Sequence, residues 1–250
     1  METITSRRNT LAVHIKRLGA DRGYREQCGE FLCDGIKLLG EATSCGAEVV
    51  AVLTSAELPF RVPAGARVFG AAQGIIDSLS PLKNAQDTLF TCKMPPQGGF
   101  DHIEGTQILL DGIQDPGNVG AVIRTASAFG IACVILAGKC ADLYNPKTIR
   151  ASMGAIFRQR VINAGIDELG TLREKGARFI GAALGRDCAS ILDRDLKNTI
   201  IAIGNEGQGL SPEVLSLCCE KVAIPMQPGC ESLNAAAAAA ILMWEAFIRS

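Results

Sequence analysis

The chain of 250 residues lacks the features that mark several classes of protein. Aromatic residues make up only 5% of it, and it has a single tryptophan. Its longest strongly apolar run, residues 235–244, is mostly alanine. A membrane-spanning helix needs roughly twenty apolar residues, so no span is predicted. The first eight residues have neither the apolar core nor the cleavage site of a secretory signal. We therefore expect a cytoplasmic protein.

Metal-ligand spacing is also missing. There are two histidines, His14 and His102, and the ten cysteines are scattered along the chain with no C-x-x-C pair. Structural zinc sites draw their ligands from closely spaced cysteines and histidines. We expect no metal centre, and we expect the cysteines to be reduced, mostly buried, small apolar side chains.

A large excess of positive charge is absent as well, because the net charge is −1. The basic residues are nevertheless clustered: the first 25 residues contain six against two acids, and a second cluster spans residues 147–160. Such clusters suit a phosphate backbone, although an ordinary solvated surface can have the same composition. The candidate phosphate contacts are Arg7, Arg8, Arg25, Lys147 and Arg150.

The chain is predicted to form two α/β domains. The Pro-Pro-Gln-Gly-Gly run that begins at Pro95 cannot continue a helix or a strand. We therefore predict a first domain at 1–94, a linker at 95–106 and a second domain at 107–250. After the linker, continuous apolar segments alternate with helical ones, which indicates a parallel sheet covered on both faces. The predicted strands are 107–110, 133–137, 178–184, 199–204 and 221–224, and the predicted helices are 119–130, 166–175, 212–217 and 234–248.

The first of three motifs surrounds Asn118 and Arg124. A predicted strand ends in an Asp-Pro-Gly turn, Asn118 is placed to cap a helix, and Gly130 is placed to end it. Arg124 has apolar neighbours on both sides, so an anionic partner is expected. That partner is either a structural ion pair or a ligand.

The second motif, 204–210, follows an apolar strand. Its three glycines let the backbone approach a ligand closely, and Glu206 among them suits a ligand hydroxyl, a cation or Arg124. The spacing matches neither a P-loop nor the dinucleotide fingerprint, which disfavours a nucleotide-dependent oxidoreductase. The third motif, 224–234, leads into the last helix. Capping accounts for only one of Ser232 and Asn234, so the other is free to face a site.

In this order the three motifs resemble those of the SpoU (TrmH-type) family of SPOUT-superfamily RNA ribose 2′-O-methyltransferases. The segment 150–155 also matches a recurrent stretch of that family. Residues 25–53 are similar to the RNA-binding domain that many members carry, which itself resembles a small ribosomal protein. The resemblance implies a parallel-sheet domain with a deep trefoil knot, preceded by this small α/β domain.

The resemblance also implies the chemistry. The cofactor would be S-adenosylmethionine without a metal, the active form a homodimer, and the product a methylated ribose 2′-hydroxyl. Arg124 matches the catalytic arginine of the family; because an arginine pKa exceeds roughly 12, stabilisation of the developing alkoxide or positioning of a phosphate is favoured over a role as base. The family usually has a second serine two residues after the asparagine, and Ala236 stands there instead. The implied catalytic residues are Asn118, Arg124, Glu206, Ser232 and Asn234; the implied cofactor contacts are Leu184, Gly204, Glu206, Ile224, Met226, Ser232 and Leu233.

The expected substrate is ribosomal RNA of the 23S type, because of the additional N-terminal domain. Two alternatives stay open at this point. One is a ribose 2′-O-methyltransferase of transfer RNA, and the other is an inactive RNA-binding or ribosome-assembly factor with the same fold.

Overall fold

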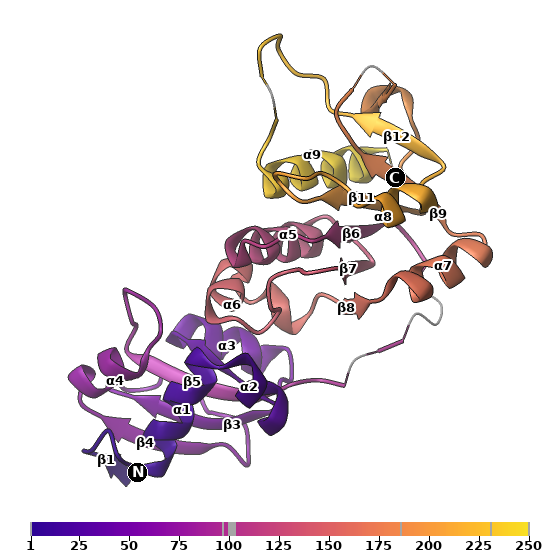
Figure 1. Ribbon diagram of the computed structural model, residues 1–250. Helices are drawn as coiled ribbons and strands as arrows, with labels where there is room; N and C mark the ends of the chain where they lie inside the picture. The colour runs from indigo at the N-terminus through magenta and orange to yellow at the C-terminus, as the bar shows by residue number, and fades with distance from the viewer. Residues whose placement is uncertain (1, 97, 100–103, 186, 231, 250) are drawn as a thin grey trace. The chain divides into compact units, whose positions relative to one another are not determined.

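The computed structural model describes residues 2–96, 98–99, 104–185, 187–230 and 232–249. Contacts between Cα atoms divide the chain into two compact units (Figure 1). The first contains residues 1–96 and 142–158, and the second contains 97–141 and 159–250. Of the predicted linker, residues 97 and 100–103 lie outside the described part, as does His102.

The first unit is built on a five-stranded mixed sheet of order β1-β4-β3-β5-β2. β1, β4 and β3 run parallel, whereas β5 is antiparallel to both β3 and β2. Its strands are β1 Glu2–Ile4, β2 Glu30–Asp34, β3 Val49–Thr54, β4 Arg67–Ala71 and β5 Thr88–Lys93. Its helices are α1 Thr10–Ala20, α2 Arg22–Cys28, α3 Ile36–Ser44, α4 Gln73–Leu79 and α6 Pro146–Ser152, followed by a short 3-10 helix at Ala155–Phe157.

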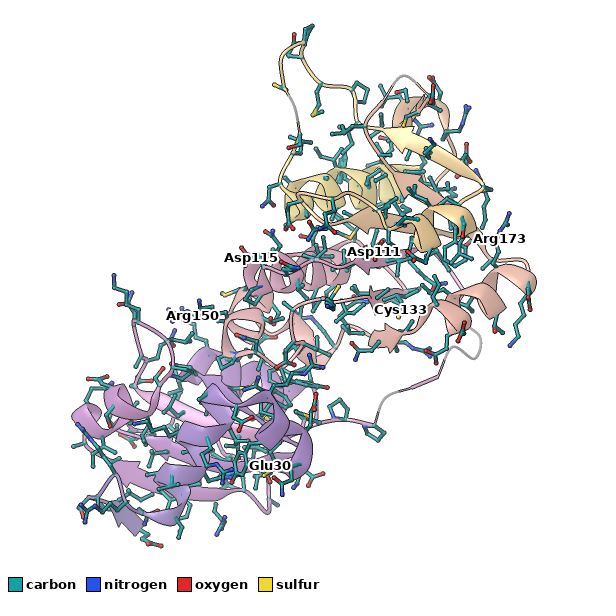
Figure 2. The ribbon with its side chains drawn as sticks, viewed as in Figure 1. Glu30, Asp111, Asp115, Cys133, Arg150 and Arg173 are labelled. Carbon is teal, nitrogen blue, oxygen red and sulfur yellow. The ribbon has the colours of Figure 1, made fainter. Side chains whose placement is uncertain are left out.

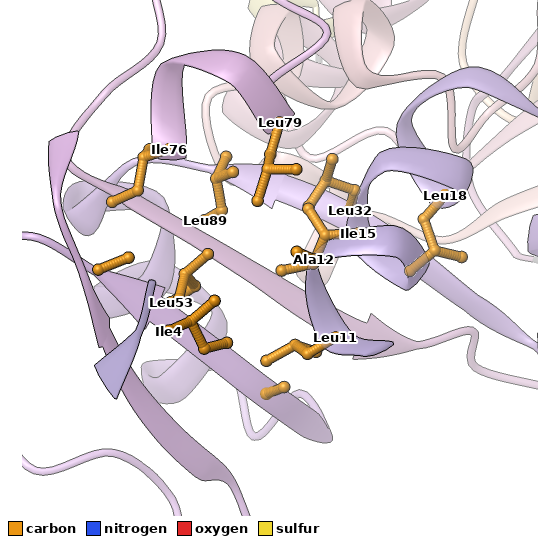
Figure 3. Packing of buried hydrophobic residues seen from close by; sticks show 12 residues of the cluster. Ile4, Leu11, Ala12, Ile15, Leu18, Leu32, Leu53, Ile76, Leu79 and Leu89 are labelled. Atoms are coloured by element: carbon orange, nitrogen blue, oxygen red, sulfur yellow. The ribbon is translucent and has the colours of Figure 1, made fainter. Parts of the chain in front are cut away.

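One face of this sheet is covered by α1 and α4 (Figure 3). α1 presents Leu11, Ala12, Ile15 and Leu18 to the sheet, which is the spacing of one apolar helix face. These side chains pack with Ile4 of β1 and with apolar residues of β3 and β5. The outer face of α1 carries the exposed residues Lys16 and Arg17, together with the exposed Val13.

The opposite face is covered in part by residues from far along the chain. Phe31 of β2 packs against Tyr144 and Phe157, with ring centroids 4.7 and 6.3 Å apart. Ile149 of α6 is buried in the same apolar cluster. The segment 142–158, which the sequence placed in the second domain, therefore belongs to the core of the first unit. An interaction over a hundred residues apart leaves no local sequence signal.

The second unit has a seven-stranded sheet in which every pair is parallel, of order β10-β12-β9-β11-β6-β7-β8. The predicted parallel α/β sheet is confirmed. Its strands are β6 Gln107–Asp111, β7 Cys133–Ala137, β8 Val161–Ala164, β9 Arg178–Ala182, β10 Ala189–Ser190, β11 Thr199–Gly204 and β12 Glu220–Ala223. Its helices are α5 Pro116–Ala128, α7 Ile166–Glu174, α8 Pro212–Leu217 and α9 Ala235–Ile248, with a 3-10 helix at Ile191–Asp193.

Helices cover both faces of this sheet. α7 and α8 bury Leu169 and Val214 against one face. α5 and α9 lie side by side (Figure 1), and they contact β7 and β11, respectively. The alanines of α9 permit this close packing, and Ala239 is fully buried. No helix in the described part of the chain is long and apolar enough to cross a membrane.

The cysteines are all free thiols. Three of them, Cys33, Cys92 and Cys133, are buried, four are half-buried and three are exposed, so fewer are buried than expected. Burial raises the pKa of Cys133 to about 11, which keeps this thiol protonated and inert.

Candidate active site

The strand ends of the second unit surround a cavity of about 450 Å³. It opens at the carboxyl edge of the sheet, where open parallel sheets bind ligands. Loops after β9, β11 and β12 contribute its walls, together with the start of α9. All the predicted cofactor contacts line this one cavity: Leu184, Gly204, Glu206, Ile224, Met226, Ser232 and Leu233.

Most of the cavity wall is apolar. Leu184 is 60% exposed and Leu233 38% exposed, although both are leucines in structured loops. Met226 and Ile224 add further apolar surface beside them. Apolar surface that is held open, with a few polar groups at its rim, is typical of a small-molecule site.

The glycine loop after β11 is closed on itself. Asn205 and Gly209 form a two-bond backbone bridge, with N···O distances of 2.9 and 2.8 Å. A Cβ on Gly204 would lie 2.1 to 2.3 Å from backbone atoms of Gly209 and Leu210. Gly204 is therefore required by close backbone approach within the loop itself, in addition to any approach of a ligand.

Two side chains that the motif analysis gave no role hold this loop in place. The Asn205 Oδ1 accepts from the backbone N–H groups of Gly207 and Gln208, and its Nδ2 donates to the Gly112 carbonyl. Asp111, buried at the end of β6 (Figure 2), accepts a 2.6 Å hydrogen bond from the Ser211 N–H. The position of Asp111 at the carboxyl end of a buried strand was the available signal.

The first turn of α5 differs from expectation. The cap is Asp115 (Figure 2), whose carboxylate accepts from the Gly117 N–H at 2.7 Å, and Pro116 occupies the first turn. The helix consequently begins three residues earlier than predicted, and Asn118 lies inside it. The predicted capping role of Asn118 was wrong, and its side chain is free for other contacts. At the other end, Gly130 has the left-handed φ of +64° expected of a helix stop.

Asn118 instead joins the three motifs. Its Nδ2 donates to the Glu206 Oε1 at 2.6 Å, and its Oδ1 accepts from the Asn234 Nδ2 at 3.1 Å. Asn234 also caps α9, accepting from the N–H groups of Ala236 and Ala237. Asn234 is therefore the capping member of the Ser232/Asn234 pair, and Ser232 lines the cavity.

Arg124 lies apart from this hydrogen-bonded chain. It is six residues beyond Asn118 on α5, which corresponds to about 9 Å along the helix and about 120° around it. It is exposed, and within the described residues it forms no ion pair. Of the two predicted kinds of partner, a structural ion pair is therefore not formed in this part of the chain, and Glu206 contacts Asn118 instead.

Of the predicted phosphate contacts, four are exposed and one is not. Arg7, Arg8 and Lys147 project from the first unit, as does Arg150 (Figure 2), which donates to the Asn84 carbonyl. Arg25 is only 3% exposed. Its guanidinium donates to the Leu18 carbonyl and pairs with Asp142. The prediction that Arg25 contacts phosphate was wrong, because its guanidinium is buried and paired with Asp142, which belongs to the distant segment 142–158.

No group of three or more His, Cys, Asp or Glu side chains that could hold a metal ion occurs among the described residues. The cavity wall offers apolar side chains, amides, the Ser232 hydroxyl and the Glu206 carboxylate, which suits an organic ligand that is neutral or carries positive charge.

The chain is similar to known proteins over almost all of its length. It is 28% identical to the 23S rRNA (guanosine(2553)-2′-O)-methyltransferase RlmP of Bacillus subtilis strain 168, over 98% of each chain. It is 31% identical to a 23S rRNA (uridine(2479)-2′-O)-methyltransferase of Streptomyces viridochromogenes, over 97% of this chain and 91% of that one. The crystal structure of the SpoU methyltransferase AviRb from Streptomyces viridochromogenes, in complex with the cofactor AdoMet, has a TM-score of 0.85 and 29% identity, over 97% and 98% of the two chains.

A family model also matches residues 105–244, which include all three motifs and the whole cavity wall. By this match and by the similarity along its length, the chain belongs to the SpoU rRNA methylase family.

Proposed function

We propose that this protein is an S-adenosylmethionine-dependent methyltransferase that modifies a ribose 2′-hydroxyl in ribosomal RNA. The observation that carries the proposal is a cavity lined by the second and third family motifs, with Asn118 of the first motif hydrogen-bonded to Glu206 in its wall. The names of two relatives that match along the whole chain point the same way, because both are named as 23S rRNA 2′-O-methyltransferases.

The cavity fits the cofactor by the chemistry of its wall. Leu184, Ile224, Met226 and Leu233 would hold the adenosine between apolar surfaces, and the loop at Gly204 would bracket it with backbone groups. When bound, S-adenosylmethionine supplies an electrophilic methyl group. The rigid glycine loop would fix the position of this ligand before the RNA arrives.

The polar chain at the rim would act on the ribose. Asn118 holds the Glu206 carboxylate through Oε1, which leaves Oε2 to accept from a ribose hydroxyl. Asn234 fixes the Asn118 amide from the other side, and the cap on α9 fixes Asn234. These residues would orient the sugar while Ser232 contacts ligand from the cavity wall.

Arg124 would stabilise the negative charge that develops on the 2′-oxygen, or hold the neighbouring phosphate. A guanidinium stays protonated at neutral pH, so removal of the 2′-proton by Arg124 is disfavoured. Its exposure without an ion pair within the described residues leaves its charge available to an RNA anion.

The proposal includes a homodimer. Phe129, Trp244 and Phe247 form an aromatic cluster at the ends of α5 and α9, with ring centroids 5.6 to 6.0 Å apart. Trp244 and Phe247 are each 48% exposed, and Ile248 is 49% exposed beside them. Exposed aromatic clusters of this kind typically mark protein interfaces.

Dimerisation through this cluster would also explain the separation of Arg124 from Asn118. Arg124 precedes Phe129, which caps the end of α5, by five residues, or about 7.5 Å along the helix axis. In a symmetric dimer the partner subunit's Arg124 would then complete the site that Asn118 and Glu206 begin.

Three further parts of the proposal rest on the family and on topology. The C-terminal segment would form a deep trefoil knot, for which the insertion of β11 between β6 and β9 is the supporting feature. The first unit would be the RNA-binding domain, with Arg7, Arg8, Lys147 and Arg150 as contacts. An rRNA substrate would place the protein in the cytoplasm.

The decisive experiment maps ribose methyl groups by mass spectrometry on ribosomal and transfer RNA incubated with the protein and isotope-labelled S-adenosylmethionine. We expect one labelled 2′-O-methyl site in the large-subunit rRNA. Label only in tRNA would redirect the substrate assignment. Label in neither RNA, together with no binding of S-adenosylhomocysteine in calorimetry, would favour an inactive assembly factor.

Mixed dimers test the shared site. Arg124→Ala and Asn118→Ala should each abolish turnover, and Arg124→Ala should still bind S-adenosylhomocysteine. Mixing the two variants should restore about a quarter of wild-type activity, because half of the dimers then contain one intact site of two. No recovery, with exchange of subunits verified, would place Arg124 and Asn118 in the same subunit's site.

A further inference from the structure

The outer face of α1 carries positive charge that nothing in the active site uses. Lys16 and Arg17 are exposed on this face, two turns after Arg7 and Arg8, which are exposed in the turn before the helix. The inner face packs into the core (Figure 3), so the two faces are sharply different. We call Arg7, Arg8, Lys16 and Arg17 the α1 surface.

The nearby acids are engaged elsewhere. Asp21 caps α2 through the Tyr24 N–H, and Glu26 pairs with Arg22 at 2.8 Å. Glu30, labelled in Figure 2, pairs with His14 and with Lys93. Burial alone would raise the pKa of Glu30, but the hydrogen bonds from Lys93 and His14 outweigh it and lower this pKa.

The α1 surface therefore keeps its charge. Within the described residues none of its four cations has an ion-pair partner. The remaining acid among the first thirty residues is Glu2, which lies on β1.

Arg17 differs from the other three because it is held on an aromatic ring. Its Cζ lies 3.8 Å from the centroid of the Tyr24 ring. The Tyr24 hydroxyl is hydrogen-bonded to the His14 Nδ1 at 2.9 Å, and the His14 Nε2 lies 3.2 Å from Glu30. A half-buried series of side chains thus fixes the ring from behind, while Arg17 itself stays exposed.

We propose that the α1 surface binds an unpaired segment of RNA, with a base stacked on Arg17 and neighbouring phosphates on Arg7, Arg8 and Lys16. RNA-binding proteins stack unpaired bases on aromatic rings and on guanidinium planes, and a prefixed guanidinium offers such a platform. Base-paired RNA presents no free base face, so the surface selects loops over duplexes. The inference rests on the proposed RNA substrate and adds where and how the first unit contacts it.

The test measures binding of two labelled RNAs by the full-length protein, using fluorescence anisotropy at several salt concentrations. One RNA is a hairpin with a ten-nucleotide loop, and the other is a blunt duplex with the same number of phosphates. Arg17→Ala should weaken hairpin binding about tenfold, within the range known for loss of one stacked base, and should affect the duplex far less. Arg17→Lys should behave like Arg17→Ala toward the hairpin, because it restores charge but not the plane.

Arg67→Ala provides the matched control. Arg67 is another exposed arginine of this unit near an aromatic ring, with its Cζ 5.7 Å from the Phe69 centroid, and it lies on β4 outside the α1 surface. It should bind the hairpin like the wild type. The double variant Arg7→Ala/Arg8→Ala should weaken both RNAs alike and reduce the salt dependence by about two charges.

The outcomes separate this inference from the substrate assignment. Equal hairpin affinities for wild type, Arg17→Ala and Arg67→Ala would overturn the inference while leaving the proposed methyltransferase function intact. Restoration of hairpin binding by Arg17→Lys would overturn the stacking role. A wild-type protein that binds neither RNA would overturn both. Thermal unfolding and S-adenosylhomocysteine binding of each variant verify that both units are folded.

Discussion

Substitution of Gly204 by alanine tests whether the glycine loop is a prebuilt wall of the cofactor cavity. The new Cβ would lie 2.1 Å from the Gly209 carbonyl carbon and 2.2 Å from the Leu210 nitrogen. Backbone atoms cannot rotate away as the end of a side chain can. The loop must therefore move by more than 1 Å, since ordinary contacts of a Cβ begin near 3.4 Å.

That movement breaks the bridge between Asn205 and Gly209. Two backbone hydrogen bonds, of 2.9 and 2.8 Å, are lost or strained. At roughly 1 kcal/mol for each bond, plus overpacking strain of roughly 1–3 kcal/mol, the intact loop loses about 3–5 kcal/mol. If the loop opens locally instead of unfolding the whole unit, the same free energy reduces cofactor affinity.

Calorimetric titration with S-adenosylhomocysteine and thermal unfolding measure these two costs. We expect Gly204→Ala to bind at least a hundredfold more weakly than the wild type, which corresponds to about 2.7 kcal/mol. Gly207→Ala is the matched control in the same loop, because its Cβ would meet only the Asn205 Oδ1, at 3.6 Å. Equal affinity and equal Tm for the two variants would refute the steric argument.

Three other substitutions test separate parts of the structure. Asn118→Ser shortens the side chain that joins Glu206 to Asn234. It should lower kcat at least tenfold, while S-adenosylhomocysteine binding changes less than about threefold. An unchanged kcat would remove these hydrogen-bonded side chains from the mechanism. Arg25→Ala leaves the Asp142 carboxylate without its partner and should cost about 3 kcal/mol in urea unfolding, whereas a loss below about 0.5 kcal/mol would mean that water replaces the pair. Hydrogen bonds from Arg178 and then Arg194 lower the pKa of Glu220, so its stabilisation is present above its ordinary pKa of 4.5 and is lost as the pH falls below that value. Glu220→Gln should flatten this part of the acid dependence in urea midpoints measured from pH 6 to pH 3, and an unchanged curve would contradict the assignment.

Local sequence signals predicted most of the second unit. Buried parallel strands are continuous apolar runs, so β7 and β11 were predicted with their observed bounds. The residues of the cavity wall were implied by the family resemblance, and they come together because loops at the carboxyl ends of parallel strands meet at one edge of the sheet. The start of α5 was misplaced because Asp115 and Asn118 are both good caps, and Pro116 between them decides in favour of Asp115.

Three features were not predicted, and one of them, the role of Arg25, depends on a distant contact. Nothing near Arg25 in the sequence indicates that Asp142 neutralises it, so its charge looked available. α1 was not predicted as a helix, although its apolar residues at 11, 12, 15 and 18 follow a helical period. This segment was interpreted only by its basic residues. The separation of Arg124 from Asn118 required the helix geometry of α5, since sequence proximity suggested that they act together.

The return of residues 142–158 to the first unit also governs when that unit can fold during synthesis. A domain that ends at Pro96 could fold as soon as it leaves the ribosome, ahead of the rest of the chain. In this protein Phe31 lacks its packing partners Tyr144 and Phe157 at that stage, and Arg25 lacks its ion-pair partner Asp142. These partners are complete only after some sixty further residues have been synthesised. At roughly 5–20 residues per second, the half-built unit stays incomplete for about 3–12 s. Nascent chains released after residue 96 should therefore be the species most dependent on chaperones, because their first unit still lacks the segment 142–158 that completes its core.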